Sequence, residues 1–179
     1  MASSARPAAI PGPSARPRRR VTTAQRRRLR LRRELWPEVK EDQLWDRTQF
    51  VGFTTIPRTL SLILHIIDSL DKKTAGRVYF DLWCRAFDDY VVEIRDEYEA
   101  ALSSGYEGQR AIRTWRERIA VLEDLGFVHA KKAPHGAYRY VLVLEPHDVI
   151  ASLQKKGKVP EELGLALHAQ MLSIGAVRY

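Results

Sequence analysis

The chain has 179 residues and a formal net charge of +8, and 45% of its residues are hydrophobic. This length favours one folded domain with appendages over two full domains, and the hydrophobic content is sufficient for a buried core. The single cysteine, Cys84, excludes an internal disulfide, argues against a zinc cluster and favours a reducing, cytoplasmic compartment. The longest apolar run, residues 60–67, is far shorter than the roughly 20 residues that a membrane span needs, so we expect a soluble protein.

The basic excess lies entirely in the first 34 residues, which contain eleven arginines and one glutamate, a net charge of +10. The remaining 145 residues carry 19 basic and 21 acidic residues, a net charge of −2. Residues 1–20 are mainly Ala, Ser, Pro and Arg, with too few apolar side chains to offset the entropy lost on folding. We therefore predict a largely disordered basic N-terminal arm at residues 1–34, in which residues 22–35 become helical when phosphates neutralise their charge. Such an arm attracts polyanions whatever their sequence. The arginines of the arm that are expected to contact such a polyanion are Arg18, Arg19, Arg20, Arg26, Arg27 and Arg28.

Two other interpretations of the arm stay open. An arginine-rich, acid-poor start is also typical of an organellar transit peptide, and it can also be a merely solubilising segment or a wrongly assigned start. A secretory signal is not indicated, because no apolar segment follows the arginines.

Residues 35–54 are predicted to be a linker that lies on the folded body as a short helix or strap. Trp36 and Trp45 stand there among acidic residues, and large aromatic side chains in a linker commonly serve as packing anchors.

The main domain is predicted at residues 55–145 and begins with a helix over residues 55–71. Thr55 is a suitable N-cap, and Pro57 suits the first turn because its missing N–H has no partner there. The helix is apolar on nearly all of its faces, which indicates a central position. His65, within it, is expected to be a hydrogen-bonded core residue.

A second helix is predicted over residues 76–87, ended by Asp88 and Asp89, and Cys84 is expected to be a small core residue of it. The side chains expected to face inward are Tyr79, Leu82, Trp83 and Phe87. A strand at residues 90–94, a helix at residues 96–102 and a turn at residues 103–105 are predicted to follow.

The chain is organised around a helix predicted at residues 107–125. Its apolar residues recur at steps of three and four, which places them on one face and leaves a polar face free. The apolar face comprises Ile112, Trp115, Ile119 and Leu122. The polar face comprises Arg110, Arg113, Thr114 and Glu117.

A glycine stop and a two-stranded ribbon are predicted after this helix. Gly126 suits a left-handed helix end. Strands are predicted at residues 127–131 and 138–144, joined by a turn at residues 134–136.

Two further helices are predicted after the ribbon, at residues 146–155 and 161–174. The last helix has leucines and a methionine at steps of four, and a terminal apolar helix of this kind is often a dimer contact. Residues 146–179 are therefore predicted to contribute to a homodimer.

The start of the helix at 107–125 carries the residue types that contact DNA bases. The major groove of B-DNA admits a helix, arginine forms a two-pronged hydrogen bond with guanine, and glutamine pairs with adenine. An ordinary solvated face remains the alternative, because Arg113 and Glu117 also form an i,i+4 ion pair on any exposed helix. The predicted contacts on this helix are Gln109, Arg110, Arg113, Thr114 and Glu117.

The ribbon tip is a second candidate contact, because basic side chains are favoured along phosphates and in the narrow minor groove. The residues concerned are Lys131, Lys132, His135 and Arg139.

The segment R-x-W-R-x-R-I-x-x-L-E-D-L-G-F-V, from Arg113 to Val128, resembles the passage from recognition helix to wing in winged helix-turn-helix domains of bacterial regulators. The resemblance implies a mainly α fold with a small antiparallel β-wing, extended here by C-terminal helices and the basic arm. It also implies that Gln109, Arg110, Arg113 and Thr114 contact bases, and it assigns Lys131, Lys132 and Arg139 to the wing.

No catalytic motif was found in the sequence. A phosphate-binding glycine loop, a His-Glu-x-x-His motif and a Gly-x-Ser-x-Gly motif are all absent, and the five histidines are scattered. We therefore expect no enzyme, metal, cofactor or small-molecule substrate.

The favoured function is sequence-specific binding of double-stranded DNA by a cytoplasmic, nucleoid-associated transcription regulator. A replication or partition factor of a bacterial chromosome, plasmid or phage fits equally. Two alternatives stay open: an architectural DNA- or RNA-binding protein in which the arm does most of the binding, and a winged module that contacts other proteins.

Overall fold

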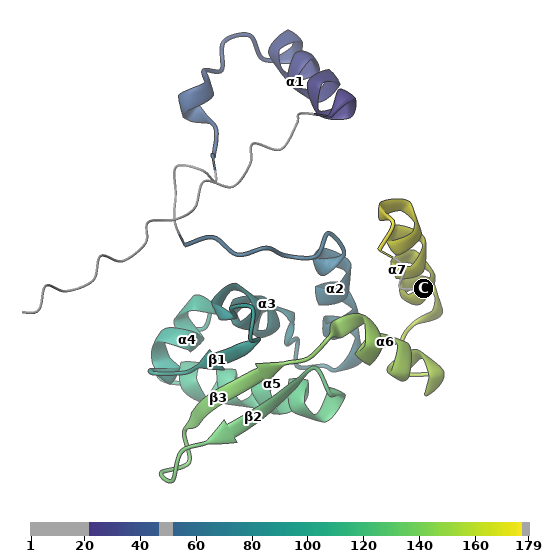
Figure 1. Ribbon diagram of the computed structural model, residues 1–179. Coiled ribbons are helices and arrows are strands. Elements are labelled where there is room, and N and C mark those ends of the chain that lie inside the picture. Colours follow the sequence, from purple (N-terminus) through teal and green to yellow (C-terminus); the bar gives the residue numbers. More distant parts are fainter. Residues whose placement is uncertain (1–21, 47–51, 177–179) are drawn as a thin grey trace, which may run out of the picture. The chain divides into compact units, whose positions relative to one another are not determined.

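The computed structural model describes residues 22–46 and 52–176 of the chain (Figure 1). The chain divides into two units, Met1–Gln49 and Phe50–Tyr179, which are considered separately. Across the described residues, every helix is too short or too polar to traverse a bilayer.

The first unit contains helix α1 (Thr23–Leu35) and the short 3-10 helix η1 (Glu41–Gln43). Thr22 caps α1 by accepting a hydrogen bond from the Gln25 N–H at 3.2 Å, and Glu41 pairs with Arg32 across the turn between the two helices. The helix predicted over residues 22–35 is therefore present as α1. A side-chain cap and ion pairs support it without a phosphate partner, although it buries none of its residues. Residues 1–20, which are predicted to be disordered, lie outside the described residues.

The linker tryptophans are not packing anchors within this unit. Trp36 is 53% exposed and Trp45 is 70% exposed. The prediction that both residues anchor the linker on the folded body concerns a contact between the two units and stays a prediction.

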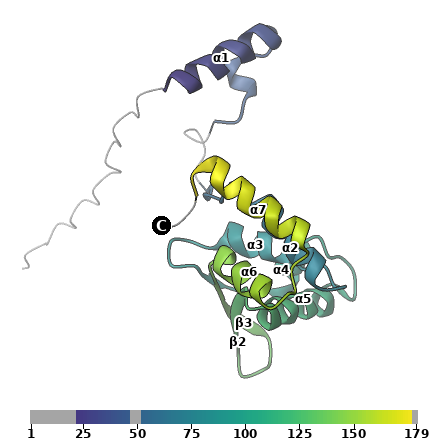
Figure 2. The same cartoon turned by 90° about the vertical axis from the view of Figure 1, so that its right-hand side faces the viewer.

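The second unit is mainly helical with one small antiparallel sheet, as predicted (Figures 1 and 2). Both views place the tip of the β2–β3 hairpin at one end of this unit and α7, beside α2, at the other. The elements are α2 (Leu60–Leu70), α3 (Gly76–Arg85), β1 (Val91–Glu93), α4 (Glu97–Ser103), α5 (Ala111–Leu125), β2 (Val128–Lys132), β3 (Tyr138–Val143), α6 (Pro146–Lys155) and α7 (Glu161–Ile174).

The sheet has the strand order β1-β3-β2 and carries a bulge in its central strand. Lys131 pairs with Tyr140, and the next residue, Lys132, pairs with Tyr138, so Arg139 is an extra residue in β3. A bulge resets the alternation of a strand between its two faces. Tyr138 is consequently buried, although strict alternation from Val141 would place it on the exposed face.

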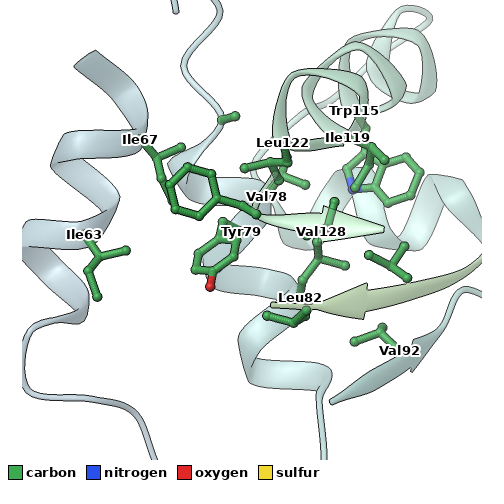
Figure 3. Close-up of a cluster of buried hydrophobic side chains, with 14 of the residues drawn as sticks. Ile63, Ile67, Val78, Tyr79, Leu82, Val92, Trp115, Ile119, Leu122 and Val128 are labelled. Atoms are coloured by element: carbon green, nitrogen blue, oxygen red, sulfur yellow. The ribbon is translucent and has the colours of Figure 1, made fainter. Parts of the chain in front are cut away.

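The core forms where α5, α3, α2 and the inner face of the sheet meet (Figure 3). Trp115, Ile119 and Leu122 of α5 are fully buried, which confirms the predicted apolar face for these three residues; Ile112 is only partly buried. Tyr79 of α3 packs edge-on against Phe127 with ring centroids 5.6 Å apart. The core therefore holds α5 by the face that carries Trp115, Ile119 and Leu122.

Three predicted helix boundaries are wrong. The first helix starts at Leu60 rather than at Thr55, because the Thr55 segment is extended and its carbonyl accepts a hydrogen bond from Trp83 Nε1 at 3.1 Å. The second ends at Arg85, so that Phe87 is 82% exposed instead of inward. The long helix starts at Ala111 rather than at 107, because Gly108 has a φ of 77°, which a right-handed helix does not allow.

The C-terminal helices have the predicted boundaries. Leu167 of α7 is buried, whereas Leu165 and Leu172 are 63% and 57% exposed. Gln170 ties α7 to the chain before α2 by donating to the Arg58 carbonyl at 3.1 Å. The homodimer stays a prediction.

His65 and Cys84 are both exposed, so their prediction as core residues is wrong. Both residues fall on the faces opposite the buried ones, which comprise Leu60, Ile63, Ile66 and Ile67 in α2 and Gly76, Val78, Tyr79 and Leu82 in α3. Partial burial still raises the pKa of the Cys84 thiol, assisted by the nearby charge of Asp81. A raised thiol pKa opposes the reactivity of a nucleophilic cysteine.

Candidate nucleic-acid interface

Helix α5 is placed by the turn that joins it to α4. Asp96 caps α4 by accepting from the Tyr98 N–H at 2.8 Å. Gly105 follows α4 with a φ of 83°, and a Cβ there would lie 2.8 Å from the Arg77 guanidinium. Gly108 supplies a second left-handed residue before Arg110 leads into the helix. The turn thus requires glycine at two positions.

The predicted contact residues at this end of the molecule differ in their placement. Gln109 and Arg110 precede α5 and are exposed, and Arg113, in its first turn, has a side chain that is 81% exposed. Thr114 is partly buried, and Glu117 has a side chain that is 35% exposed.

Four of the predicted residues line one open hollow between α5 and the β2–β3 hairpin, which we call the α5 hollow. Gln109 comes from the turn before α5, Arg113 and Glu117 come from the exposed face of α5, and Lys132 comes from β2. Arg110 and Thr114 lie outside its lining. The α5 hollow is lined by Gln109, Ile112, Arg113, Arg116, Glu117, Ala120, Lys132 and Tyr138.

Glu117 pairs with two cations of α5 and one cation of a loop at one wall of the hollow. Its carboxylate lies 3.2 Å from Arg113 Nε, 3.4 Å from Lys73 Nζ and 3.7 Å from Arg118 Nη1. The hydrogen bonds from Arg113 and then Lys73 lower the pKa of Glu117. Lys73, in the loop between α2 and α3, was missed by sequence reasoning, because nothing in the sequence brings residue 73 to residue 117.

The arginines of α5 have different partners. Arg118 is mostly buried, donates to the Thr74 carbonyl at 3.0 Å and lies over the Tyr106 ring. Arg116 binds Glu97 of α4 with two nitrogens. Arg113 is bound only by Glu117 among the described residues and is far more exposed than the other two. It is therefore the arginine of α5 best placed to contact a ligand.

Glu97 is a buried carboxylate that joins three elements. It is 9% exposed, it accepts from Arg116 Nε at 3.0 Å on both oxygens, and it accepts from the Tyr138 N–H at 2.9 Å. The hydrogen bond to Glu97 raises the pKa of Arg116. Sequence reasoning missed this residue; the only signal was an acidic residue directly after a helix N-cap.

The predicted hairpin residues are spread over both faces of the sheet. Lys132 lies over the Tyr138 ring, 4.8 Å from its centroid, at the edge of the α5 hollow. Lys131 is exposed, and His135 is exposed in the turn between the strands. Arg139 pairs with Glu93 of β1 at 2.7 Å, so the structure does not place it at the hollow.

The predicted arm residues belong to the first unit. Arg26, Arg27 and Arg28 are exposed on α1. Arg18, Arg19 and Arg20 lie outside the described residues.

A hydrogen-bonded chain of Thr59, His147 and Glu145 lies outside the interface. Thr59 Oγ1 is 2.9 Å from His147 Nε2, and His147 Nδ1 is 2.5 Å from Glu145 Oε1. Thr59 is only 1% exposed, so its hydroxyl is not accessible to a substrate. The hydrogen bonds of these three residues join the start of α2 to α6. Within residues 22–46 and 52–176, no three His, Cys, Asp or Glu side chains are grouped to hold a metal ion.

Comparison with known proteins gives no relative: no protein-family model, no curated protein and no solved structure matches the chain.

Proposed function

We propose that the second unit binds double-stranded DNA as a winged helix-turn-helix domain, with the start of α5 in the major groove and the β2–β3 hairpin along the phosphate backbone. The observation that carries the proposal is the convergence of Gln109, Arg113 and Lys132, from two elements, on one open hollow. The element order from α3 to β3 and the strand order β1-β3-β2 are compatible with this domain type.

The side chains that line the α5 hollow suit contacts with base edges in a DNA groove and with the phosphates beside it. Arg113 is exposed at the first turn of α5 and can donate two hydrogen bonds to guanine O6 and N7, and Gln109 can pair with adenine. Lys132 offers a point charge to a phosphate. Since Trp115 fixes the opposite side of α5 in the core, the helix backbone that carries Arg113 is held in place before DNA binds, which lowers the entropic cost of binding.

The first unit supplies attraction without sequence preference. Residues 1–34 carry a net charge of +10, and each phosphate that they neutralise releases condensed counterions. The remaining residues, 35–179, have a net charge of −2 and have to supply the selectivity through their own contacts. We propose on this basis a sequence-specific regulator or maintenance factor associated with the nucleoid.

A selection from random DNA duplexes with the full chain tests the proposal. The expected result is enrichment of one motif, which the full chain then binds more tightly than random duplex at the same salt concentration. Enrichment of no motif, with equal affinity for all duplexes, would support an architectural role driven by the arm. Absence of any affinity for DNA or RNA at low salt would instead support a protein-interaction module.

A further inference from the structure

Tyr138 is the point at which the β2–β3 hairpin is fastened to the helices. Its backbone N–H donates to Glu97 at 2.9 Å, and its hydroxyl donates to Glu123 of α5 at 3.3 Å. Its ring packs edge-on against Trp115 with centroids 5.9 Å apart. A residue only 5% exposed thus connects the hairpin with α4 and α5 through its backbone, its hydroxyl and its ring.

The two glutamates fasten both strands of the hairpin. Glu123 accepts from the Ala130 N–H in β2 at 3.0 Å as well as from the Tyr138 hydroxyl in β3. Glu97 accepts from the first residue of β3 and, at the same time, from Arg116 of α5. A buried carboxylate with several charge-assisted donors is held firmly, and it is costly to leave without them.

This fastening lies at the boundary of the proposed interface. Arg116 and Tyr138 both line the α5 hollow, and the Tyr138 ring carries Lys132 above it. The bonds of Glu97 and Glu123 therefore connect the hairpin wall, which carries Lys132, to the helix wall, which carries Arg113. A hairpin that was free to pivot would place Lys132 at a range of distances from α5.

We propose that Glu97 is a positioning residue for DNA recognition: through Arg116 and the Tyr138 N–H it holds the hairpin at one distance from α5, so that base and backbone contacts fit the same stretch of duplex. This inference rests on the proposed function. Glu97 itself is buried and touches no DNA; it acts through the hairpin.

Spin labels measure the position of the hairpin without DNA. The full chain with Cys84→Ser would carry labels at His135→Cys in the hairpin turn and Asp124→Cys near the end of α5, both at exposed positions. We expect one narrow distance distribution, and a broad one when Glu97→Gln is added. The matched control is Glu93→Gln, which removes the same charge from the Arg139 pair on the sheet and should leave the distribution narrow.

Binding to the selected duplex is measured on the unlabelled proteins. Glu97→Gln should lower the preference for the selected site over random duplex about tenfold, which corresponds to about 1.4 kcal/mol. Its affinity for random duplex and the salt dependence should stay unchanged, because no DNA-contacting cation is removed. Arg116→Lys, which keeps the charge opposite Glu97, should retain more of the preference than Arg116→Gln.

The outcomes separate the two proposals. An unchanged distance distribution in a folded Glu97→Gln protein overturns the inference, and so does a broadened distribution with an undiminished site preference. If Glu97→Gln does not fold, as circular dichroism would show, Arg116→Gln breaks the same pair from its more exposed side and should give the same broad distance distribution. If the unaltered chain binds no duplex, the proposed function fails, while the spin labels still decide whether Glu97 holds the hairpin.

Discussion

Replacement of Arg113 by alanine is the sharpest test of the α5 surface. Its side chain is 81% exposed, and among the described residues it is bound only to Glu117, at 3.2 Å. Glu117 keeps Lys73 and Arg118 when the arginine is removed. The variant should therefore fold with little change in stability, because a solvent-exposed ion pair contributes little.

The expected loss is confined to the selected duplex. One two-pronged contact with guanine is worth about 1–3 kcal/mol of discrimination, which corresponds to a loss of about 5- to 150-fold in affinity. Affinity for random duplex should hardly change. The slope of log affinity against log salt should also stay constant, whereas the loss of a phosphate contact would reduce it by about 0.9.

Fluorescence anisotropy with the selected duplex and a random duplex, at several salt concentrations, measures both quantities. Arg95→Ala is a matched control, since that side chain is also 81% exposed and also lies 3.2 Å from its glutamate partner, Glu93, but does not line the α5 hollow. Equal losses on both duplexes, or equal effects of the two variants, would refute the assignment of Arg113 to a base.

Three further predictions concern the arm, the pH dependence and the last helix. Removal of residues 1–34 should weaken binding to all duplexes alike and flatten the salt dependence, which the same anisotropy titrations would show; a loss restricted to the selected duplex would contradict it. Burial, followed by the charge and hydrogen bond of Glu123, raises the pKa of Tyr138 from 10.0 to about 12. The stability that the neutral phenol contributes should therefore be complete below pH 10 and lost as the pH rises to about 12. Urea unfolding of Tyr138→Phe should show a smaller loss of stability over this pH range than the unaltered chain. Leu165→Ser should shift a dimer towards monomer in sedimentation equilibrium, because Leu165 is 63% exposed on a helix with an apolar outer face; an unchanged mass would place any dimer contact elsewhere.

The order and type of the elements in the second unit follow from local sequence signals. Helix α5 shows steps of three and four in its apolar residues, Gly126 ends it, and Pro146 starts α6. These signals act within a few residues, so the sequence alone was sufficient. The predicted exposure of Arg113 followed from the same periodicity and is confirmed.

The errors arise where distant residues decide the local structure. Trp83 binds the carbonyl of Thr55, 28 residues earlier, and keeps that segment extended. Lys73 reaches Glu117, and Glu97 reaches Tyr138, across 44 and 41 residues. No sequence periodicity encodes such pairs, and the parts of the site that depend on them were accordingly missed.

The bulge at Arg139 shows how the hairpin would respond to a change in chain length. Lys131 and Lys132 are adjacent, yet their partners, Tyr140 and Tyr138, are two positions apart. In a chain that lacked residue 139, the two tyrosines would be adjacent. The pairing of β2 residues with β3 residues would be retained, and the Tyr138 side chain would still face inward. Deletion of one residue from β2 would instead turn the side chains between the deletion and the hairpin tip to the opposite face of the sheet. Homologous chains should therefore vary in length at position 139 before they do so in β2.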